Sequence, residues 1–379
     1  MKTYSIIYAL LALVVIGCSK SSDSPPIEEI EEQENFFNAD YILLQESSGV
    51  LSTQLLESSE TRIDLSPAES TFTNVPFSDV IFLKGSIFAN YTKLTDCSGQ
   101  VTVHDFSDDT SNIVAVFDDL VACNLSVTSI FIEGNTLYVS YVLEETSKID
   151  TYHVRAIDLS VSEDNFVDVE LDKKPLQLVF TNGKLFVLTI DLEITDEYSL
   201  SVIDGASTTV IHEIGLGYDV VQIFQDAEQN MIIAYQELHT VLNSNTMGVQ
   251  YISYEEGKEP MFSDSKFNCF DSQGRLFYKR PVDDAVYSNI PAIYDFSNNL
   301  AILYFYENFL TESQLEFEYK IGDTTMVSYD DANSIMLVGY QKMDDASKGG
   351  LLRIQLEPVP ELLDNLDLDG VPYQLFYQN

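Results

Sequence analysis

Residues 79–91 read DVIFLKGSIFANY, an apolar run followed by a tight polar turn at Lys84-Gly85 and a second apolar run. Two short apolar runs that flank a turn containing glycine predict a β-hairpin. The same phrase returns in residues 129–142, 177–190, 222–236, 268–280 and 326–341. The turn glycines Gly85, Gly134 and Gly183 follow one another at intervals of 49 residues. The chain therefore repeats one structural unit.

Each unit has room for a second hairpin after the first. Residues 151–171 (TYHVRAIDLSVSEDNFVDVEL) and 198–216 (YSLSVIDGASTTVIHEIGL) carry this second hairpin pattern, and long amphipathic helical patterns are absent. Units of four strands that repeat every 40 to 50 residues are typical of a β-propeller. We predict an all-β protein whose residues 38–379 form a β-propeller of about seven four-stranded blades. Six or eight blades stay open, because residues 265–325 fit one expanded blade or two compact ones; a β-sandwich or a pair of β-domains is the alternative.

The first hairpin of this region, residues 41–56 (YILLQESSGVLSTQLL), has no leading pair of strands of its own. A propeller must close its ring, because an open sheet edge invites aggregation. We therefore expect the N-terminal hairpin to complete the last blade and close the ring.

The first eighteen residues have the pattern of an export signal. Lys2 precedes an apolar run over residues 6–16, which is too short to span a bilayer, and Gly17 precedes Cys18. A charged start, a short apolar core and a small residue at the end are typical of a cleaved signal peptide, here residues 1–17. Residues 18–37 mix serine, proline and a run of glutamates, which predicts a flexible acidic linker with a reach of up to about 60 Å.

Val15-Ile16-Gly17-Cys18 resembles the bacterial lipobox. The resemblance implies cleavage before Cys18 and attachment of lipid to that cysteine; an ordinary signal peptide is the alternative. Leu137-Tyr138-Val139-Ser140 and Leu185-Phe186-Val187-Leu188 resemble the second strand of YVTN-type propeller repeats. The chain as a whole thus resembles the exported propeller lipoproteins of Gram-negative bacteria. The resemblance implies an outer-membrane protein, lipid-anchored and facing the cell exterior, that acts as a binding or accessory subunit.

The absence of tryptophan separates the chain from several other propeller families. WD40, kelch, sialidase Asp-box and quinone-dependent dehydrogenase repeats all use tryptophan in their defining motifs, so none of these names fits. The motifs G-x-S-x-G, H-E-x-x-H and G-x-x-x-x-G-K-[ST] are also absent, which lowers the expectation of an enzyme.

The chain is strongly acidic. It has 61 Asp and Glu against 19 Lys and Arg, a formal net charge of −42. Such a field repels phosphates, so nucleic-acid binding is excluded, whereas basic protein surfaces and cations are easier partners. An acidic surface that keeps an exported protein soluble is the simpler interpretation.

Three cysteines remain after Cys18, an odd number for an oxidising compartment. Cys97 precedes a predicted strand at residues 100–106, and Cys123 follows its hairpin partner at residues 113–117. Both cysteines then lie at the same end of one hairpin, which makes a Cys97–Cys123 disulfide possible. Cys269, inside an apolar run, is interpreted as a buried free thiol.

Metal binding has one candidate in the sequence. Asn365, Asp367 and Asp369, followed by Gly370, resemble the start of a calcium loop, in which alternate oxygens converge on the ion. Phe376 stands where such a loop normally has glutamate, and a strand or turn would use the same residues. The four histidines have no metal-ligand spacing, so we expect no transition-metal cofactor.

The densest positive cluster is Arg275, Lys279 and Arg280. On a strand, Arg275 and Lys279 share one face and Arg280 points to the other. Ion pairs with Asp283 and Asp284 are the simpler interpretation. The alternative is a site that binds an anion or a partner beside the aromatic stretch at residues 287–306.

Three functions are compatible with these patterns. The first is a non-catalytic binding or scaffold subunit of an outer-membrane protein complex, presented by the propeller and held beside an integral outer-membrane partner. The second is capture of a small ligand, such as a metal chelate or a glycan, for a transporter. The third is a hydrolase or lactonase that depends on a divalent cation held by carboxylates. The sequence favours the first.

Overall fold

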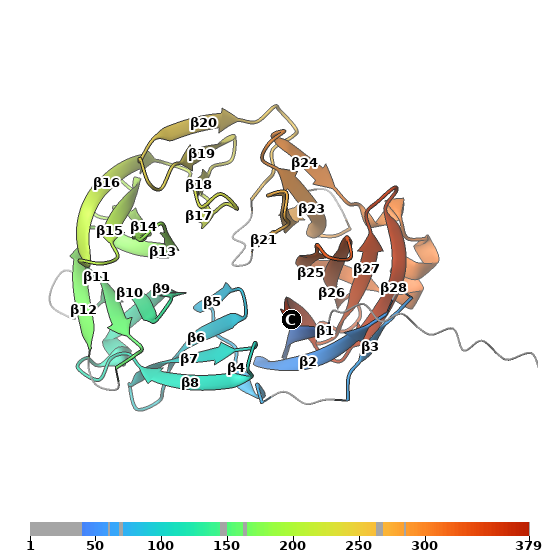
Figure 1. Ribbon diagram of the computed structural model, residues 1–379, viewed down its shortest axis with the longest axis horizontal. Helices are drawn as coiled ribbons and strands as arrows, with labels where there is room; N and C mark the ends of the chain where they lie inside the picture. Colours follow the sequence, from blue (N-terminus) through green and yellow to red (C-terminus); the bar gives the residue numbers. More distant parts are fainter. Residues whose placement is uncertain are drawn as a thin grey trace, which may run out of the picture. The chain divides into compact units, whose positions relative to one another are not determined.

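The computed structural model describes residues 40–59, 61–67, 71–144, 150–161, 165–262, 268–283 and 286–378. All of them belong to one compact unit, Phe36–Asn379. They form seven antiparallel sheets arranged as blades in a ring, so the fold is a seven-bladed β-propeller (Figure 1). The prediction of seven four-stranded blades is confirmed.

In six blades the four strands follow one another along the chain, and the first strand lies nearest the centre of the ring (Figure 1). The blades consist of β5 (Ile81–Lys84), β6 (Ile87–Lys93), β7 (Gly99–Asp105) and β8 (Thr110–Ala115); β9 (Leu125–Glu133), β10 (Thr136–Leu143), β11 (Thr151–Asp158) and β12 (Phe166–Leu171); β13 (Lys174–Thr181), β14 (Lys184–Ile190), β15 (Tyr198–Asp204) and β16 (Thr209–Gly217); β17 (Gln222–Gln225), β18 (Met231–Ala234), β19 (Leu238–Leu242) and β20 (Val249–Ser253); β21 (Cys269–Phe270), β22 (Leu276–Pro281), β23 (Asn289–Asp295) and β24 (Leu300–Leu303); β25 (Ile321–Asp330), β26 (Ile335–Lys342), β27 (Gly349–Gln355) and β28 (Glu361–Leu368).

The six repeated phrases form the two innermost strands of these six blades. Gly85, Gly134 and Gly183 lie in the tight turns between those strands, with φ of 60°, 54° and 73°. A side chain at these positions would be strained, which explains why glycine recurs there.

The seventh blade closes the ring with strands from both ends of the described chain. Its order is β29 (Val371–Gln378), β1 (Asp40–Ser47), β2 (Val50–Ser58) and β3 (Ile63–Leu65), and β4 (Val75–Pro76) also pairs with β2. β29 is the innermost strand and runs antiparallel to β1, with Tyr377 opposite Tyr41. The prediction that the N-terminal hairpin closes the ring is therefore confirmed.

The core lies between the blades, because each blade packs both of its faces against neighbours. Residues in the middle of β10 and β14 are buried on both faces of their strands. Val139 of β10 and Leu185 of β14 belong to one apolar cluster that spans three blades. Rim strands such as β8 and β16 are largely exposed instead. The rim strands therefore present side chains and one backbone edge to solvent.

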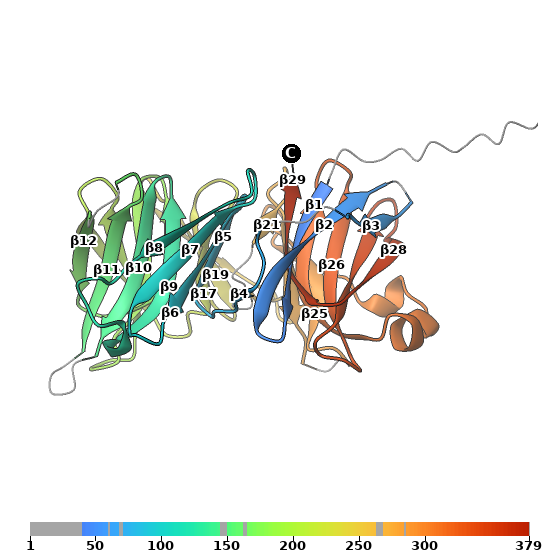
Figure 2. The same ribbon diagram turned by 90° about the horizontal axis from the view of Figure 1, so that it is seen from below.

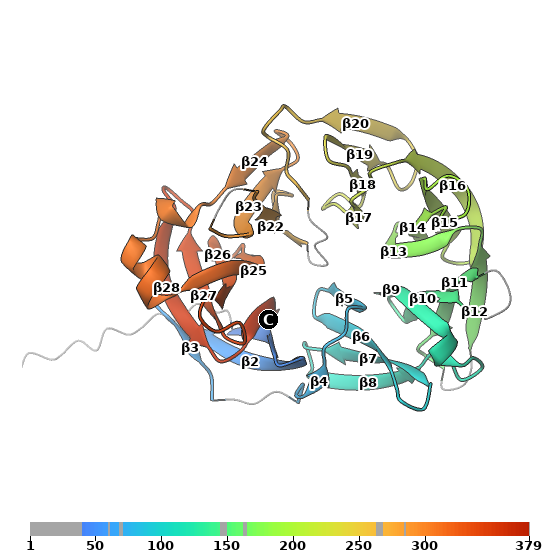
Figure 3. The same cartoon turned by 180° about the vertical axis from the view of Figure 1, so that it is seen from behind.

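The described chain contains only short helical turns. η1 (Ala122–Asn124) lies between β8 and β9, and η2 (Tyr306–Asn308) and η3 (Gln314–Glu318) follow β24. η2 and η3, drawn in orange, lie at the rim beside β28 (Figure 3). The region 265–325 therefore holds a single blade followed by helical turns. Within the described ranges, no helix is long and apolar enough to cross a membrane.

Seen from the side, the strands of each blade run between the two faces of the ring, so that the loops gather at these faces (Figure 2). Apart from its inner strands, the ring also has an outer rim, formed by β3, β8, β12, β16, β20, β24 and β28.

Candidate functional site

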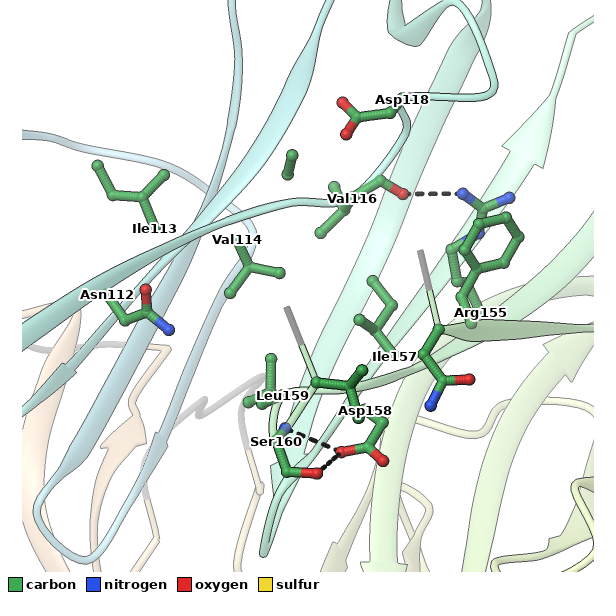
Figure 4. Close-up of a pocket in the computed structure, with 14 residues that line it drawn as sticks. Asn112, Ile113, Val114, Val116, Asp118, Arg155, Ile157, Asp158, Leu159 and Ser160 are labelled. Atoms are coloured by element: carbon green, nitrogen blue, oxygen red, sulfur yellow. Dashed lines mark hydrogen bonds between the residues drawn. The ribbon is translucent and has the colours of Figure 1, made fainter. Parts of the chain in front are cut away.

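A groove of about 720 Å³ opens between the β5–β8 blade and the β9–β12 blade. β8 and the segment after it form one wall, and the end of β11, the turn after it and the start of β12 form the other (Figure 4). Neighbouring blades in a ring diverge toward the rim, so rim strands leave space that inner strands fill. The groove is therefore a consequence of the propeller geometry at this pair of blades.

The first wall includes five consecutive residues, 112–116, of which the first four belong to β8 and the last directly follows it. Successive side chains of a strand point to opposite faces. A groove that contacts every residue in turn therefore meets the strand along its edge, where the main chain lies. Val114 points toward the groove, whereas Ile113, 62% exposed, points to the opposite face of the sheet. Val161 across the groove is 50% exposed. The groove thus combines an open strand edge with apolar side chains that face water.

Acidic side chains border these apolar groups. Asp118 and Asp158 both line the groove. The Asp158 carboxylate accepts hydrogen bonds from the backbone N–H and the hydroxyl of Ser160, at 2.8 and 2.6 Å (Figure 4). These bonds lower the pKa of Asp158, so the carboxylate is charged at neutral pH.

Arg155 is the single basic residue among those that line the groove, and its charge is already neutralised. Its side chain is 1% exposed. The guanidinium donates to both oxygens of Asp119, at 2.5 and 2.9 Å, and to both oxygens of Asp168, at 2.9 and 2.7 Å. It also donates to the Val116 carbonyl at 2.9 Å (Figure 4).

The electrostatics of Arg155 follow from these contacts. Burial opposes the charge, but the hydrogen bonds to Asp168 and Asp119 outweigh it and raise the pKa of Arg155 above its usual value. The hydrogen bond from Arg155 in turn lowers the pKa of Asp119. Both groups therefore stay ionised at any physiological pH. The N–H groups of Arg155 are already used in the hydrogen bonds to Asp119, Asp168 and Val116, so none is left to bind an anion.

Aromatic rings hold the guanidinium from the sides. Its central carbon lies 3.8 Å from the ring centroid of Phe166 and 5.3 Å from that of Phe117. Such cation–π contacts stabilise a buried guanidinium by about 1 kcal/mol or more. Arg155 thereby joins the β11–β12 pair to the segment that follows β8.

A disulfide fixes that same segment from its other end. Cys97 and Cys123 are joined, with a Cα–Cα distance of 5.0 Å, and Ala122 donates its N–H to the Cys97 carbonyl at 2.9 Å. A closed loop with a sequence separation of 26 residues stabilises a fold by roughly 3–4 kcal/mol in the chain-entropy account. The wall of the groove is therefore rigidly held. Cys269 is a free thiol, half-buried, with Sγ 3.8 Å from Ser328 Oγ.

His104, Ser111 and Asp109 lie together in the β5–β8 blade. His104 Nδ1 is 2.6 Å from Ser111 Oγ, and His104 Nε2 is 3.3 Å from Asp109 Oδ1. This is the order of a nucleophile, a base and an orienting acid. However, the imidazole is 0% exposed and packs against Phe72 and Phe106, so it has no access to a leaving group.

The third strand of other blades carries a buried polar residue with a structural role similar to that of His104. In four blades a buried polar residue of the third strand bonds to a residue of the fourth strand or to the one directly after it. The pairs are His104 with Ser111, Arg155 with Asp168, His239 with Tyr254, and Arg353 with Asp364. We therefore assign His104 to the fastening of a rim strand rather than to catalysis.

Acidification is expected to destabilise the propeller through His239. Its side chain is fully buried, and burial lowers the pKa of His239 from 6.5 to about 4. Between these values the unfolded chain binds a proton that the folded chain does not, so stability present above pH 6.5 is lost as the pH falls. We expect a loss of about 2 kcal/mol between pH 7 and pH 5 from this group.

Urea unfolding of the wild type and His239→Phe at both pH values checks this prediction. The variant should lose about 2 kcal/mol less than the wild type on acidification. An equal loss in the two proteins would mean that His239 does not carry the effect.

Arg275 and Arg280 of the predicted positive cluster have different partners. Arg275 lies just before β22 and pairs with Asp271, with Nε 2.6 Å from Oδ2, rather than with Asp283. Arg280 donates to the Glu259 carbonyl at 2.9 and 3.3 Å. Asp284 lies outside the described residues. Lys279 lies in β22, directly before Arg280. Docking of an anion or a partner at Arg275, Lys279 and Arg280 stays a prediction.

The aromatic stretch beside that cluster belongs mainly to the core. Tyr287, Tyr294 and Tyr306 are at most 5% exposed. Among the described aromatic residues of this stretch, Phe305 is the one whose ring is exposed, at 38%. The stretch therefore offers little aromatic surface to a ligand.

The residues of the predicted calcium loop lie on or just after β28. Asn365 Oδ1 accepts a hydrogen bond from the Tyr340 hydroxyl at 2.8 Å. Asp367 pairs with Lys342 at 2.8 Å and Asp369 with Lys348 at 3.1 Å. Among the described residues, no group of three or more His, Cys, Asp or Glu could hold a metal ion. Calcium binding by these oxygens stays a prediction.

Comparisons with known proteins concern the fold. No protein-family model and no curated protein matches the chain. The puromycin-hydrolysing peptidase of Mycobacterium tuberculosis is similar in structure, with a TM-score of 0.49 and 10% identity over 85% of this chain and 53% of that chain. A puromycin hydrolase has a TM-score of 0.50 and 8% identity over 88% and 54%, and a eukaryotic initiation factor 0.45 and 10% over 90% and 98%.

This chain spans about half the length of the two puromycin-hydrolysing proteins. At 8% identity, the likeness to the puromycin hydrolase concerns the fold alone and carries no activity across. The function of this chain must therefore be argued from its own residues.

Proposed function

We propose that this protein is a lipid-anchored propeller of the bacterial outer membrane, facing the cell exterior, which binds a partner protein without catalysing a reaction. The proposal is supported by two observations together: a sequence with the pattern of an export signal that ends in Gly17-Cys18, and a closed seven-bladed ring. Residues 1–37, including Cys18, lie outside the described residues.

The physical mechanism is presentation beside a membrane partner. Each acyl chain on Cys18 gains about 0.8 kcal/mol per buried CH₂, so several chains hold a folded domain on a bilayer. The acidic linker sets the distance, and the ring presents a rigid rim. Rigid presentation lowers the entropy lost on binding, so a modest interface can hold a partner.

Non-catalytic binding is supported by the chemistry of the described residues. The Ser111–His104–Asp109 arrangement contains a fully buried imidazole, and Arg155 is held by two carboxylates. The groove instead offers apolar side chains, carboxylates and a strand edge, which are means of binding rather than of bond cleavage.

Fractionation of cells that express the wild type and Cys18→Ala tests the anchor. We expect the wild type in the outer-membrane fraction, labelled by palmitate and cleaved by protease added to intact cells. Cys18→Ala should lose the label and leave the membrane fraction. A wild type that is unlabelled and soluble would overturn the proposal.

A further inference from the structure

We propose that the partner contributes an extended, positively charged segment that lies along β8 and adds a fifth strand to its blade. This inference rests on the proposed function, since it specifies how the partner is bound. It is carried by the hydrogen-bonding geometry of β8, by the apolar walls of the groove and by the charge around it.

β8 has a free edge whose main-chain groups can be assigned. Among the strands that the structure describes, β8 is the last of its sheet, so only one of its edges is paired, with β7. Val116 donates its N–H to the Gly99 carbonyl at 3.0 Å, and the β7–β8 register continues without a bulge. Hydrogen-bonded and non-hydrogen-bonded pairs alternate in an antiparallel ladder. The N–H and C=O groups of Ser111, Ile113 and Ala115 therefore point away from β7, toward the groove.

An added strand would find both hydrogen bonds and apolar contacts there. Its main chain would bond to Ile113 and Ala115, as in β-augmentation, where the backbone provides affinity and alternate side chains provide specificity. Val114 of β8 and Val161, which is 50% exposed, stand on opposite walls of the groove. Every second side chain of the segment would enter between them, so those positions should be apolar.

The remaining side chains of the segment would meet carboxylates. Asp118 and Asp158 line the groove, and Arg155 is neutralised by Asp119 and Asp168. The chain as a whole carries a formal charge of −42. Lysine or arginine at the alternate positions is complementary to this field, whereas an acidic segment is repelled.

Direct binding of a model peptide tests the inference. The probes are fluorescein-labelled Lys-Val-Lys-Val-Lys-Val-Lys and its counterpart in which glutamate replaces lysine, titrated with the full chain in detergent and followed by fluorescence anisotropy. We expect the lysine peptide to bind, more weakly at high salt, and the glutamate peptide not to bind. Hydrogen exchange in the wild type should show slower exchange at the Ile113 and Ala115 amides when the lysine peptide is present.

A proline substitution separates strand addition from attraction by charge alone. Ala115→Pro removes an outward N–H and no bond to β7, and proline is tolerated on edge strands. It should weaken peptide binding by about tenfold or more, the cost of about one lost hydrogen bond plus the clash of the ring. Val249→Pro is the matched control, because the same alternation leaves the Val249 N–H of rim strand β20 pointing outward.

The outcomes are distinct. Equal binding by the wild type and Ala115→Pro, equal binding of both peptides, or no binding of the lysine peptide would overturn the inference. If Ala115→Pro still recovers the natural partner from membranes at the wild-type level, the partner uses another surface, and the proposed function stands without this inference.

Discussion

A chain that ends before Val371 is expected not to fold as a stable monomer. Such a chain lacks β29, the innermost strand of the closing blade. Leu375 and Phe376 of this strand are at most 3% exposed, and each contributes to an apolar cluster shared with neighbouring strands. Removing them exposes the β1 edge and two apolar faces, and burying each such side chain stabilises the fold by roughly 1.5–3 kcal/mol. Together with the lost backbone hydrogen bonds between β29 and β1, the loss is of the same order as the roughly 5–15 kcal/mol by which most domains are stable.

Circular dichroism and size-exclusion chromatography of the truncated chain check this prediction. We expect loss of the cooperative thermal transition and a shift to aggregates. Addition of a synthetic peptide with the sequence of residues 371–378 should restore the transition, since it supplies the missing strand. A matched control that begins at residue 38 should unfold like the full chain. A truncated monomer with an unchanged transition would contradict the closure described for the seventh blade.

Replacing Arg155 with methionine is expected to lower the free energy of unfolding by about 3 kcal/mol. Removing one partner of a buried ion pair typically costs about 3–5 kcal/mol, because the other charge is left without compensation. Asp119 and Asp168 are 40% and 30% exposed, so water partly replaces the guanidinium and the cost falls at the low end. Methionine keeps much of the apolar stem between Phe117 and Phe166.

Urea denaturation of the wild type and four variants measures this effect. Arg155→Lys should lose less than Arg155→Met, because it keeps the charge but not the fork that bonds two carboxylates. The double variant Arg155→Met/Asp168→Leu should recover part of the loss, since it removes one of the stranded charges. Arg353→Met is the comparison at the equivalent position of another blade. A loss below about 0.5 kcal/mol for Arg155→Met would show that the ion pairs do not stabilise the fold.

Much of the fold could be predicted because the propeller repeats a local signal. The hairpin phrases such as residues 79–91 and 177–190 combine apolar runs with turn glycines, and each phrase formed the inner hairpin of a blade. The closure of the ring by the N-terminal hairpin could be predicted as well, because this hairpin has no leading pair of strands with which to form a blade of its own. The choice between one blade and two within residues 265–325 could not be made, because residues 304–320, which contain η2 and η3, have no strong helical pattern and are long enough for further strands.

The groove could not be predicted from the sequence, because it depends on the divergence of two blades at the rim. Arg155 is a visible signal, since it stands between Val154 and Ala156 in the buried middle of β11. Its partner Asp119 lies in the segment between β8 and β9, and no spacing rule links the two. Likewise, Lys342 and Lys348 approach Asp367 and Asp369 only through pairing within one blade and its adjoining turns.

The central claim is that a lipid-anchored propeller binds a partner protein at the outer membrane. The most direct test is affinity purification of the full chain from gently solubilised membranes, with mass spectrometry of everything that co-purifies. We predict recovery of an integral outer-membrane protein in stoichiometric amount, lost when Cys18→Ala removes the anchor. Recovery of a lone monomer, or of a bound small molecule in place of a protein, would contradict the account.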